Sequence, residues 1–382
     1  MAMTRRNLLH GIAAAGTVIA AGAPPVGAFA PSEPKQPLPG APASGPTLLN
    51  CNENAYGPSP KVLAVIREAA ATSSRYPRGE YDALRKMLAD LHKVKPEQIV
   101  LGSGSSEILR MAGAAYLGPN KKLILPNPTY PFLGNYAEAN GIPVLKVPLT
   151  KLREHDTDAM LAGADSSTGL VYICNPNNPT GTLTPRQNIE SLIGKLPADV
   201  MILVDEAYHH YVSAGTAYRS FLDHPLGDPR VVVSRTFSTI YGLAGLRIGY
   251  SVSSVDVAGR LAALRLQNGV AILSVKAAMA ALKDTAYVRM AAKRNADDRQ
   301  EFMNHANARM LRAIDSHANF VLLNTVRPAS EVIAHLEKNG VLVAPPIPAM
   351  EKYIRVSLGT PAEIKEFWRV WDLMPGGGHM AM

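Results

Sequence analysis

Polar residues that could bind a small anionic ligand follow three short apolar runs of the sequence. Gly102–Glu107 reads Gly-Ser-Gly-Ser-Ser-Glu, Asn175–Gly181 reads Asn-Pro-Asn-Asn-Pro-Thr-Gly, and Asp205–Tyr208 reads Asp-Glu-Ala-Tyr. Glycines let a backbone approach a ligand closely, and free amides and hydroxyls at the start of a helix suit a phosphate group. The Gly/Ser turn alone is weak evidence, because such turns also serve as ordinary helix caps.

The apolar runs before these turns have the length and composition of buried strands. Runs of this kind occur at Gln98–Leu101, Lys122–Pro126, Gly169–Cys174, Val200–Asp205, Val231–Ser234 and Arg247–Val252, and they alternate with amphipathic stretches at Tyr81–His92, Glu107–Leu117, Pro185–Leu196 and Val255–Leu266. This alternation predicts an α/β fold with a mostly parallel sheet covered by helices on both faces. Ligands of such sheets bind beyond the carboxyl ends of the strands, so the three polar turns should lie together at one edge.

The C-terminal part of the chain has a different pattern. A long helical stretch at Thr285–Ala313 precedes shorter segments at Ala318–Asn324, Arg327–Asn339 and Tyr353–Ser357. This pattern predicts a smaller α+β domain, to which Asn50–Ala70 would contribute from the front of the chain.

Composition and charge exclude several classes of protein. The 382 residues are 47% hydrophobic and 18% charged with a net charge of +8, which excludes disorder, collagen-like repeats and a disulfide scaffold. The basic residues are spread out and carry no interleaved aromatics, so we expect no nucleic-acid partner. We expect no metal site either, because there is no CxxC or HxxxH pattern and His209 and His210 are adjacent.

Two longer motifs accompany the three polar turns. Arg235–Tyr250 reads Arg-Thr-Phe-Ser-Thr-Ile-Tyr-Gly-Leu-Ala-Gly-Leu-Arg-Ile-Gly-Tyr, and Asn52–Pro58 reads Asn-Glu-Asn-Ala-Tyr-Gly-Pro. Shorter matching segments are Arg75–Pro77, Pro128–Pro131 and Tyr353–Thr360. In this order and spacing the motifs resemble those of fold type I pyridoxal-phosphate (PLP) aminotransferases of the histidinol-phosphate aminotransferase-like group. The resemblance runs from about residue 48 to residue 372.

This resemblance implies the domain organisation and the general activity. It implies a large PLP-binding domain at residues 75–272 and a small domain built from residues 47–74 and 273–372. It also implies a homodimer and an aminotransferase that acts on an α-amino acid or a related amine. The cofactor would be PLP or pyridoxamine phosphate (PMP).

The resemblance further implies which residues hold the cofactor ring. Asp205 would lie against the ring nitrogen, where a carboxylate raises the nitrogen's pKa and keeps it protonated. Tyr208 and Asn178 would hydrogen-bond the ring hydroxyl, and Tyr130 would stack on the face of the ring.

The remaining roles concern the phosphate and the substrate. Arg355 would bind the substrate α-carboxylate as a bidentate fork, and Tyr56 would reach into the partner subunit's site. The phosphate-binding residues implied by the resemblance are Ser105, Ser106, Thr236, Ser238 and Arg247.

One position departs from the family pattern at the centre of the chemistry. The family's Schiff-base lysine lies eight residues before the phosphate-binding arginine, and eight residues before Arg247 this chain has Thr239. That lysine attaches the cofactor covalently and moves a proton at the substrate Cα, and a hydroxyl can do neither near neutral pH. Non-covalent cofactor binding is therefore expected, and ordinary transamination is not. Lys276, Tyr241 and His209 are the alternative bases that the sequence offers.

A second departure concerns the substrate side chain. Relatives typically place an arginine that binds the substrate's distal acidic group where this chain has Ala344 and Pro345. Histidinol phosphate is consequently not the expected substrate. Three hypotheses follow: an aminotransferase with residual or altered activity, a non-catalytic periplasmic protein that binds PLP, PMP or an amine, and an enzyme of another reaction type that uses the same site.

The N-terminus has the features of an export signal. Arg5 and Arg6 precede a short, weakly hydrophobic run at Gly11–Gly22, and Val26–Ala28 offers a small-residue cleavage site. We therefore expect a twin-arginine-type signal peptide at residues 1–28, a linker at 29–46, a flexible tail at 373–382 and a periplasmic protein that leaves the membrane after signal removal. In that oxidising compartment a Cys51–Cys174 disulfide is one arrangement, and two buried thiols are the ordinary one.

The export signal gives a first prediction. Replacing both Arg5 and Arg6 by Lys should leave the protein in the cytoplasm, because the twin-arginine route reads the arginine pair. Cell fractionation of a reporter fusion measures this. A fusion that still reaches the periplasm in a strain without the twin-arginine machinery would refute the signal assignment.

Overall fold

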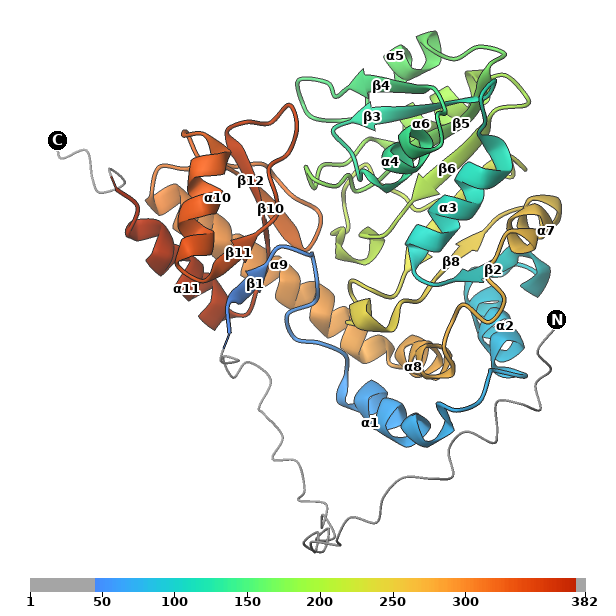
Figure 1. Cartoon of the computed structure of the whole chain (residues 1–382), viewed down its shortest axis with the longest axis horizontal. Coiled ribbons are helices and arrows are strands. Elements are labelled where there is room, and N and C mark those ends of the chain that lie inside the picture. The colour runs from blue at the N-terminus through green and yellow to red at the C-terminus, as the bar shows by residue number, and fades with distance from the viewer. Residues whose placement is uncertain (1–44, 376–382) are drawn as a thin grey trace, which may run out of the picture. The chain divides into compact units, whose positions relative to one another are not determined.

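The computed structural model describes residues 45–375. The predicted signal peptide, most of the linker and most of the C-terminal tail lie outside these residues. Figure 1 labels the helices and strands along the chain.

A seven-stranded sheet forms the centre of the larger part of the fold (Figure 1). Its strands, in spatial order, are β2 (Ile99–Gly102), β8 (Gly249–Val252), β7 (Val231–Thr236), β6 (Met201–Asp205), β5 (Thr168–Cys174), β3 (Lys122–Asn127) and β4 (Val144–Pro148). All neighbouring strands are parallel except β8, which runs antiparallel to both β2 and β7. The predicted mostly parallel sheet is therefore confirmed.

Helices cover both faces of this sheet because its strands are apolar on both sides. On one face lie α3 (Ser105–Tyr116), α4 (Phe132–Ala139) and α7 (Val255–Ala263); on the other lie α2 (Glu80–His92), α5 (Thr157–Ala162), α6 (Arg186–Lys195) and α8 (Ile272–Lys283). Successive strand residues alternate between the two cores: Tyr172 packs with the first group, and Val171 and Ile173 pack with the second.

A smaller set of elements surrounds a second hydrophobic core. A three-stranded antiparallel sheet has the order β12 (Tyr353–Ser357), β10 (Phe320–Asn324), β9 (Arg312–Ala313), and a parallel pair joins β1 (Thr47–Leu49) to β11 (Val341–Val343). The helices of this part are α10 (Ala329–Lys338), α11 (Pro361–Asp372) and the far half of α9 (Thr285–Ala308), whose Phe302 packs against Phe367 and Trp368.

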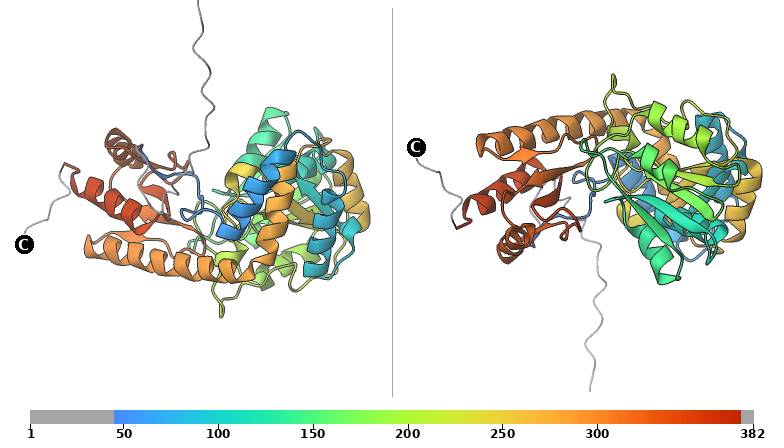
Figure 2. Two further views of the ribbon diagram at one scale, coloured as in Figure 1. Left: turned by 90° about the horizontal axis from the view of Figure 1, so that it is seen from below. Right: turned by 90° about the horizontal axis from the view of Figure 1, so that it is seen from above.

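Two details differ from the sequence-based expectation. The long helix ends at Ala308 rather than continuing to Ala313, because Arg312 and Ala313 pair with β10 as a short strand. The front segment divides its contacts: β1 joins the small core, whereas α1 (Pro60–Ala69) packs against α8. Figure 2 shows α9, in orange, running alongside the small sheet. The helix also contacts η4 (His209–Tyr211), the turn that follows β6.

A buried ion pair fixes the ends of β6 and β7 side by side. Glu206 directly follows β6, and its carboxylate accepts hydrogen bonds from Arg235 Nε at 2.9 Å, Ser220 Oγ at 2.8 Å and the Phe221 amide at 2.8 Å. The Arg235 Nη2 to Glu206 Oε2 distance is 2.7 Å, and the two side chains are 4% and 0% exposed. Every charged atom named here has a partner, which a buried pair requires.

Removing one member of this pair should destabilise the fold strongly. Glu206→Gln leaves the Arg235 guanidinium buried without its counter-charge, so the free energy of unfolding should fall by about 3–5 kcal/mol. Chemical denaturation measures the loss. The matched control is Glu366→Gln, which breaks an exposed pair with Arg369 and should cost less than about 1 kcal/mol. Equal losses in the two variants would contradict this account.

Candidate active site

A cavity of about 460 Å³ opens at the carboxyl ends of the central strands. Loops after β5, β6 and β7 line it, together with the start of α3, the segment Asn50–Glu53 and Arg355 from β12. The structure brings together all the predicted cofactor residues and the predicted carboxylate-binding arginine: Ser105, Ser106, Tyr130, Asn178, Asp205, Tyr208, Thr236, Ser238, Thr239, Arg247 and Arg355. Of the residues predicted to bind the cofactor or the substrate, Tyr56 is the one that does not line this cavity as the described residues form it.

One end of the cavity is built from hydrogen-bond donors. Helix α3 begins at Ser105, and its N-cap residue makes no side-chain hydrogen bond. The first backbone amides, at the positive end of the helix dipole, can therefore donate to an anion here. The Ser238 hydroxyl accepts from Thr236 Oγ1 at 3.0 Å and from Arg247 Nη1 at 3.3 Å. Amides, hydroxyls and a guanidinium together suit the three oxygens of a phosphate group.

Two glycines allow this donor-rich end to form. Gly104 has φ +74° and lies against the Arg247 guanidinium, which a Cβ at this position would overlap. A Cβ at Gly249 would likewise overlap the Ser105 amide at the start of α3. Any side chain at either position would displace the arginine or the helix start.

At Asp205, the last residue of β6, the cavity has a buried carboxylate in place of hydrogen-bond donors. Its carboxylate accepts from Tyr172 Oη at 3.0 Å and from the Ala207 amide at 3.2 Å, both neutral donors. Burial, only partly offset by these hydrogen bonds, raises the pKa of Asp205 to about 6. A cationic group beside this carboxylate would relieve the desolvation penalty, which is what the protonated nitrogen of a pyridine ring supplies.

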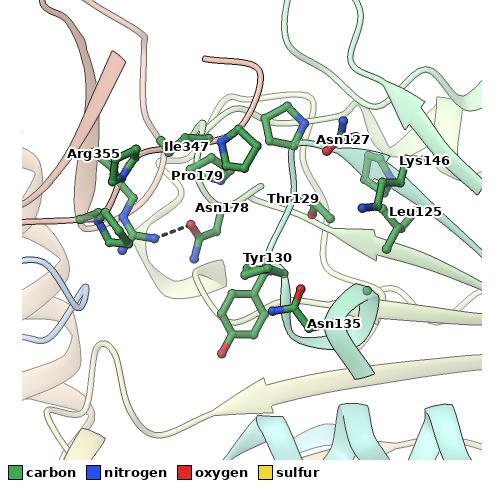
Figure 3. Close-up of a pocket in the computed structure, with 18 residues that line it drawn as sticks. Leu125, Asn127, Thr129, Tyr130, Asn135, Lys146, Asn178, Pro179, Ile347 and Arg355 are labelled. Carbon is green, nitrogen blue, oxygen red and sulfur yellow. Dashed lines mark hydrogen bonds between the residues drawn. The ribbon is translucent and has the colours of Figure 1, made fainter. Parts of the chain in front are cut away.

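Hydrogen bonds connect the middle of the cavity to β12. The Tyr208 hydroxyl accepts from Asn178 Nδ2 and from Asn52 Nδ2, each at 3.0 Å. The Asn178 amide oxygen accepts from Arg355 Nη1 at 2.7 Å, a contact drawn as a dashed line in Figure 3. Ser357 completes the series with a hydrogen bond to Asn52 Oδ1 at 3.1 Å.

Arg355 retains binding capacity after these contacts. Its Nη2 donates to the Asn50 carbonyl at 2.7 Å, but its buried Nε has no partner within the described residues. Burial lowers the pKa of its guanidinium, a sign that the charge lacks a carboxylate to stabilise it. A ligand carboxylate at this position would supply both the missing acceptor and the missing charge.

Thr239, at the position where the resemblance predicts a lysine, lines the cavity. Its hydroxyl donates to the Ala207 carbonyl at 2.9 Å, and the side chain is nearly buried. No lysine lines the cavity as formed by residues 45–375. Two of the alternative bases are engaged elsewhere: Tyr241 Oη contacts His210 Nε2 at 3.2 Å, and His209 Nδ1 contacts Tyr218 Oη at 3.0 Å. Lys276 lies on α8, outside the cavity lining.

Tyr56 does not line the cavity formed by the described residues and instead contacts α9. Its hydroxyl donates to Asp298 Oδ2 at 3.0 Å, and the Arg294 guanidinium lies 4.2 Å from the centre of its ring. Its role in a partner subunit's site remains a prediction.

Sequence reasoning missed Asn52 as a partner of Tyr208. This asparagine adopts a left-handed backbone conformation, φ 56°, which Asn tolerates better than most residues and which directs it between Tyr208 and Ser357. The Asn-Glu-Asn motif was the sequence signal that could have identified this asparagine.

The expectation of two buried thiols is wrong for one of the two cysteines. Cys51 is exposed and Cys174 is buried; both are free thiols and both line the cavity. Over residues 45–375 no group of His, Cys, Asp and Glu side chains could hold a metal ion. Across the same residues, no helix is long and apolar enough to cross a membrane.

Comparison with known proteins assigns the family. The model of "Aminotransferase class I and II" matches residues 45–370. The chain belongs to this family. It is 38% identical to a histidinol-phosphate aminotransferase 2 of Carboxydothermus hydrogenoformans over 84% of this chain and 88% of that protein. It is 34% identical to a histidinol-phosphate aminotransferase of Moorella thermoacetica over 84% and 83% of the two chains.

Comparison with a solved structure supports the fold. The histidinol-phosphate aminotransferase of Sinorhizobium meliloti, crystallised with pyridoxal-5'-phosphate, superposes with a TM-score of 0.80 at 27% identity, covering 86% of this chain and 91% of that chain. The fold type I PLP-dependent transferase architecture predicted from the motifs is therefore confirmed.

The buried carboxylate of Asp205 makes stability depend on pH in a defined direction. Its pKa is raised in the folded state, so the folded protein binds this proton more tightly than the unfolded chain, and the carboxyl destabilises the cofactor-free fold increasingly between pH 4 and pH 6. Asp205→Asn should therefore be more stable than the cofactor-free parent by up to about 3 kcal/mol at pH 8. Near pH 4 this advantage should nearly vanish.

Denaturation of both proteins between pH 4 and pH 8 measures the difference. Other titrating groups, such as the buried histidines, are common to both proteins and cancel. A variant no more stable than the parent at pH 8 would contradict the assignment of the raised pKa to this carboxyl.

Proposed function

We propose that this protein binds PLP or PMP non-covalently and acts as an aminotransferase-type protein on an α-amino acid or a related amine. The observation that carries the proposal is one cavity that combines a donor-rich end at Arg247, a buried carboxylate at Asp205 and the unsatisfied guanidinium of Arg355. A phosphate, a protonated ring nitrogen and a substrate carboxylate meet these three features respectively.

The residues present fit the cofactor. When bound, PLP supplies a ring that withdraws electrons from the substrate Cα. Asp205 would keep the proton on the ring nitrogen, and Tyr208 and Asn178 would bind the ring hydroxyl. The α3 N-terminus, Ser238 and Arg247 would hold the phosphate. Arg355 would orient the substrate by its α-carboxylate.

Thr239 limits what this arrangement can catalyse. No amine is available at this position for covalent attachment, and the hydroxyl already donates to the Ala207 carbonyl. Loss of a general base alone lowers a rate by about 10²–10⁴. Transamination by the lysine-dependent route is therefore not part of the proposal, and any turnover should be far slower than in a lysine-containing relative.

The same observation favours a second candidate function. A protein that retains the binding residues and lacks the reactive amine is suited to bind PLP, PMP or an amine without converting it. A reaction of another type that needs no covalent attachment would use the same cavity.

The sequence also supports proposals for the location, the oligomeric state and the substrate of this protein. We propose that the twin-arginine route exports the folded protein to the periplasm, and that it forms a homodimer in which Tyr56 serves the partner subunit's site. Histidinol phosphate, the compound in the names of the relatives, is not the proposed substrate, because Ala344 and Pro345 offer no cationic side chain to a second phosphate.

Cofactor binding should depend on Arg247. Calorimetry should show binding of PLP or PMP to the purified protein, and Arg247→Gln should weaken it about 10- to 150-fold, the equivalent of about 1.5–3 kcal/mol for a hydrogen bond to a charged group. Arg260→Gln, on the exposed side of α7, is the matched control and should leave affinity unchanged. No measurable affinity in the unmodified protein would remove the proposal.

Restoring the amine should restore covalent attachment. In Thr239→Lys the new amine should condense with the cofactor aldehyde with loss of water, because the surrounding ring and phosphate contacts are in place. Borohydride reduction followed by mass spectrometry should locate the cofactor on residue 239, and half-transamination of some amino acids should become measurable.

Thr239→Met, which has a long side chain and no amine, is the control and should give no adduct. If Thr239→Lys binds the cofactor without forming an adduct and converts no amino acid in a broad panel, the binding-protein function replaces the enzymatic one.

A further inference from the structure

A second cavity, of about 380 Å³, adjoins the first and has a different character. The two cavities share Tyr130, Asn178 and Arg355. Figure 3 shows Arg355 and Asn178 on one side of this second cavity, Tyr130 beside them, and Leu125, Asn127 and Lys146 on the far side. A ligand whose carboxylate binds Arg355 therefore has space to extend away from the cofactor residues.

Prolines form much of the wall of the second cavity. Seven prolines line it: Pro126, Pro128, Pro131, Pro179, Pro345, Pro346 and Pro348. Proline has no backbone N–H, so these positions offer apolar surface and no amide donors for an anion. Leu125, Ala344 and Ile347 add further apolar side chains.

The charged groups of the second cavity do not suit a charged ligand side chain. Among residues 45–375, no aspartate or glutamate lines it, so a cationic side chain would be desolvated without a counter-ion. In the proposed function Arg355 binds the α-carboxylate. Lys146 is the remaining cation in the lining, and it is half-exposed and paired with Glu138 at 2.6 Å.

We infer that this second cavity binds the substrate side chain and selects a bulky apolar one, aromatic or branched aliphatic, on an α-amino acid or its α-keto acid. The inference rests on the proposed function, because it uses Arg355 as the carboxylate anchor. Apolar surface favours such a side chain roughly in proportion to the area it buries. An acidic side chain would lose its hydration against prolines that offer no hydrogen-bond donor, which is unfavourable.

Binding of α-keto acids to the PMP-loaded full chain tests the inference without requiring turnover. Calorimetry would compare phenylpyruvate and 4-methyl-2-oxopentanoate with 2-oxoglutarate and pyruvate, which share the same α-keto carboxylate. We expect the two apolar compounds to bind at least tenfold more tightly than 2-oxoglutarate and pyruvate.

A charge placed in the cavity should change this preference. Ile347→Arg should improve 2-oxoglutarate binding and weaken phenylpyruvate binding, each by about tenfold, while pyruvate affinity stays the same. Ala349→Arg adds the same charge to the same loop at an exposed position outside the cavity lining, and it should preserve the preference of the parent.

The outcomes separate the inference from the function on which it rests. Equal affinities for all four keto acids, or tighter binding of 2-oxoglutarate by the parent, would overturn the apolar preference and leave the proposed function in place. If the PMP-loaded protein binds none of the four, the proposed function fails and the inference with it.

Discussion

The hydrogen bonds that run from Ser357 through Asn52, Tyr208 and Asn178 to Arg355 hold together the parts of the chain that form the cavity. These residues come from β12, from the segment after β1 and from the loops after β5 and β6. Each amide and hydroxyl in the series satisfies its neighbour in a buried environment, so the removal of one would leave others without partners. The position of Arg355 relative to the central sheet depends on this series, and with it the junction of the two cavities.

The cavity separates charge along its length. At Arg247 a guanidinium, hydroxyls and a helix N-terminus create a region that favours anions, while the buried Asp205 carboxylate creates one that favours a cation. The Glu206–Arg235 pair, next to Asp205 in sequence, fixes β6 against β7, and its two charges compensate each other. Asp205 and Glu206 are adjacent in sequence but differ in their partners, because one side chain meets a buried arginine and the other meets only neutral donors.

Much of this arrangement could be predicted from the sequence, because parallel strands place their carboxyl ends at one edge of a sheet. That rule placed Ser105, Asn178 and Asp205 together, and the spacing in the family that the sequence resembles, counted back from Arg247, located Thr239. The antiparallel direction of β8 could not be predicted, since a strand buried on both faces carries the same apolar pattern in either direction. The second cavity could not be predicted either. Its walls at Leu125–Asn135 and Ala344–Pro348 combine a strand end, loops and the first turn of α4, and their contact follows from tertiary packing rather than from any local period.

The hydroxyl at Thr239 changes how a bound cofactor would be retained. Without a covalent tether, retention is an equilibrium, so the occupied fraction follows the free cofactor concentration and falls on dialysis or dilution. The contribution of the cofactor to folding stability then rises as RT ln(1 + [L]/Kd), which amounts to about 2.7 kcal/mol at a hundredfold excess over Kd. If it binds the cofactor in this way, the thermal stability of the chain would follow the cofactor level of its compartment over a concentration range where a tighter, covalently bound relative would already be saturated.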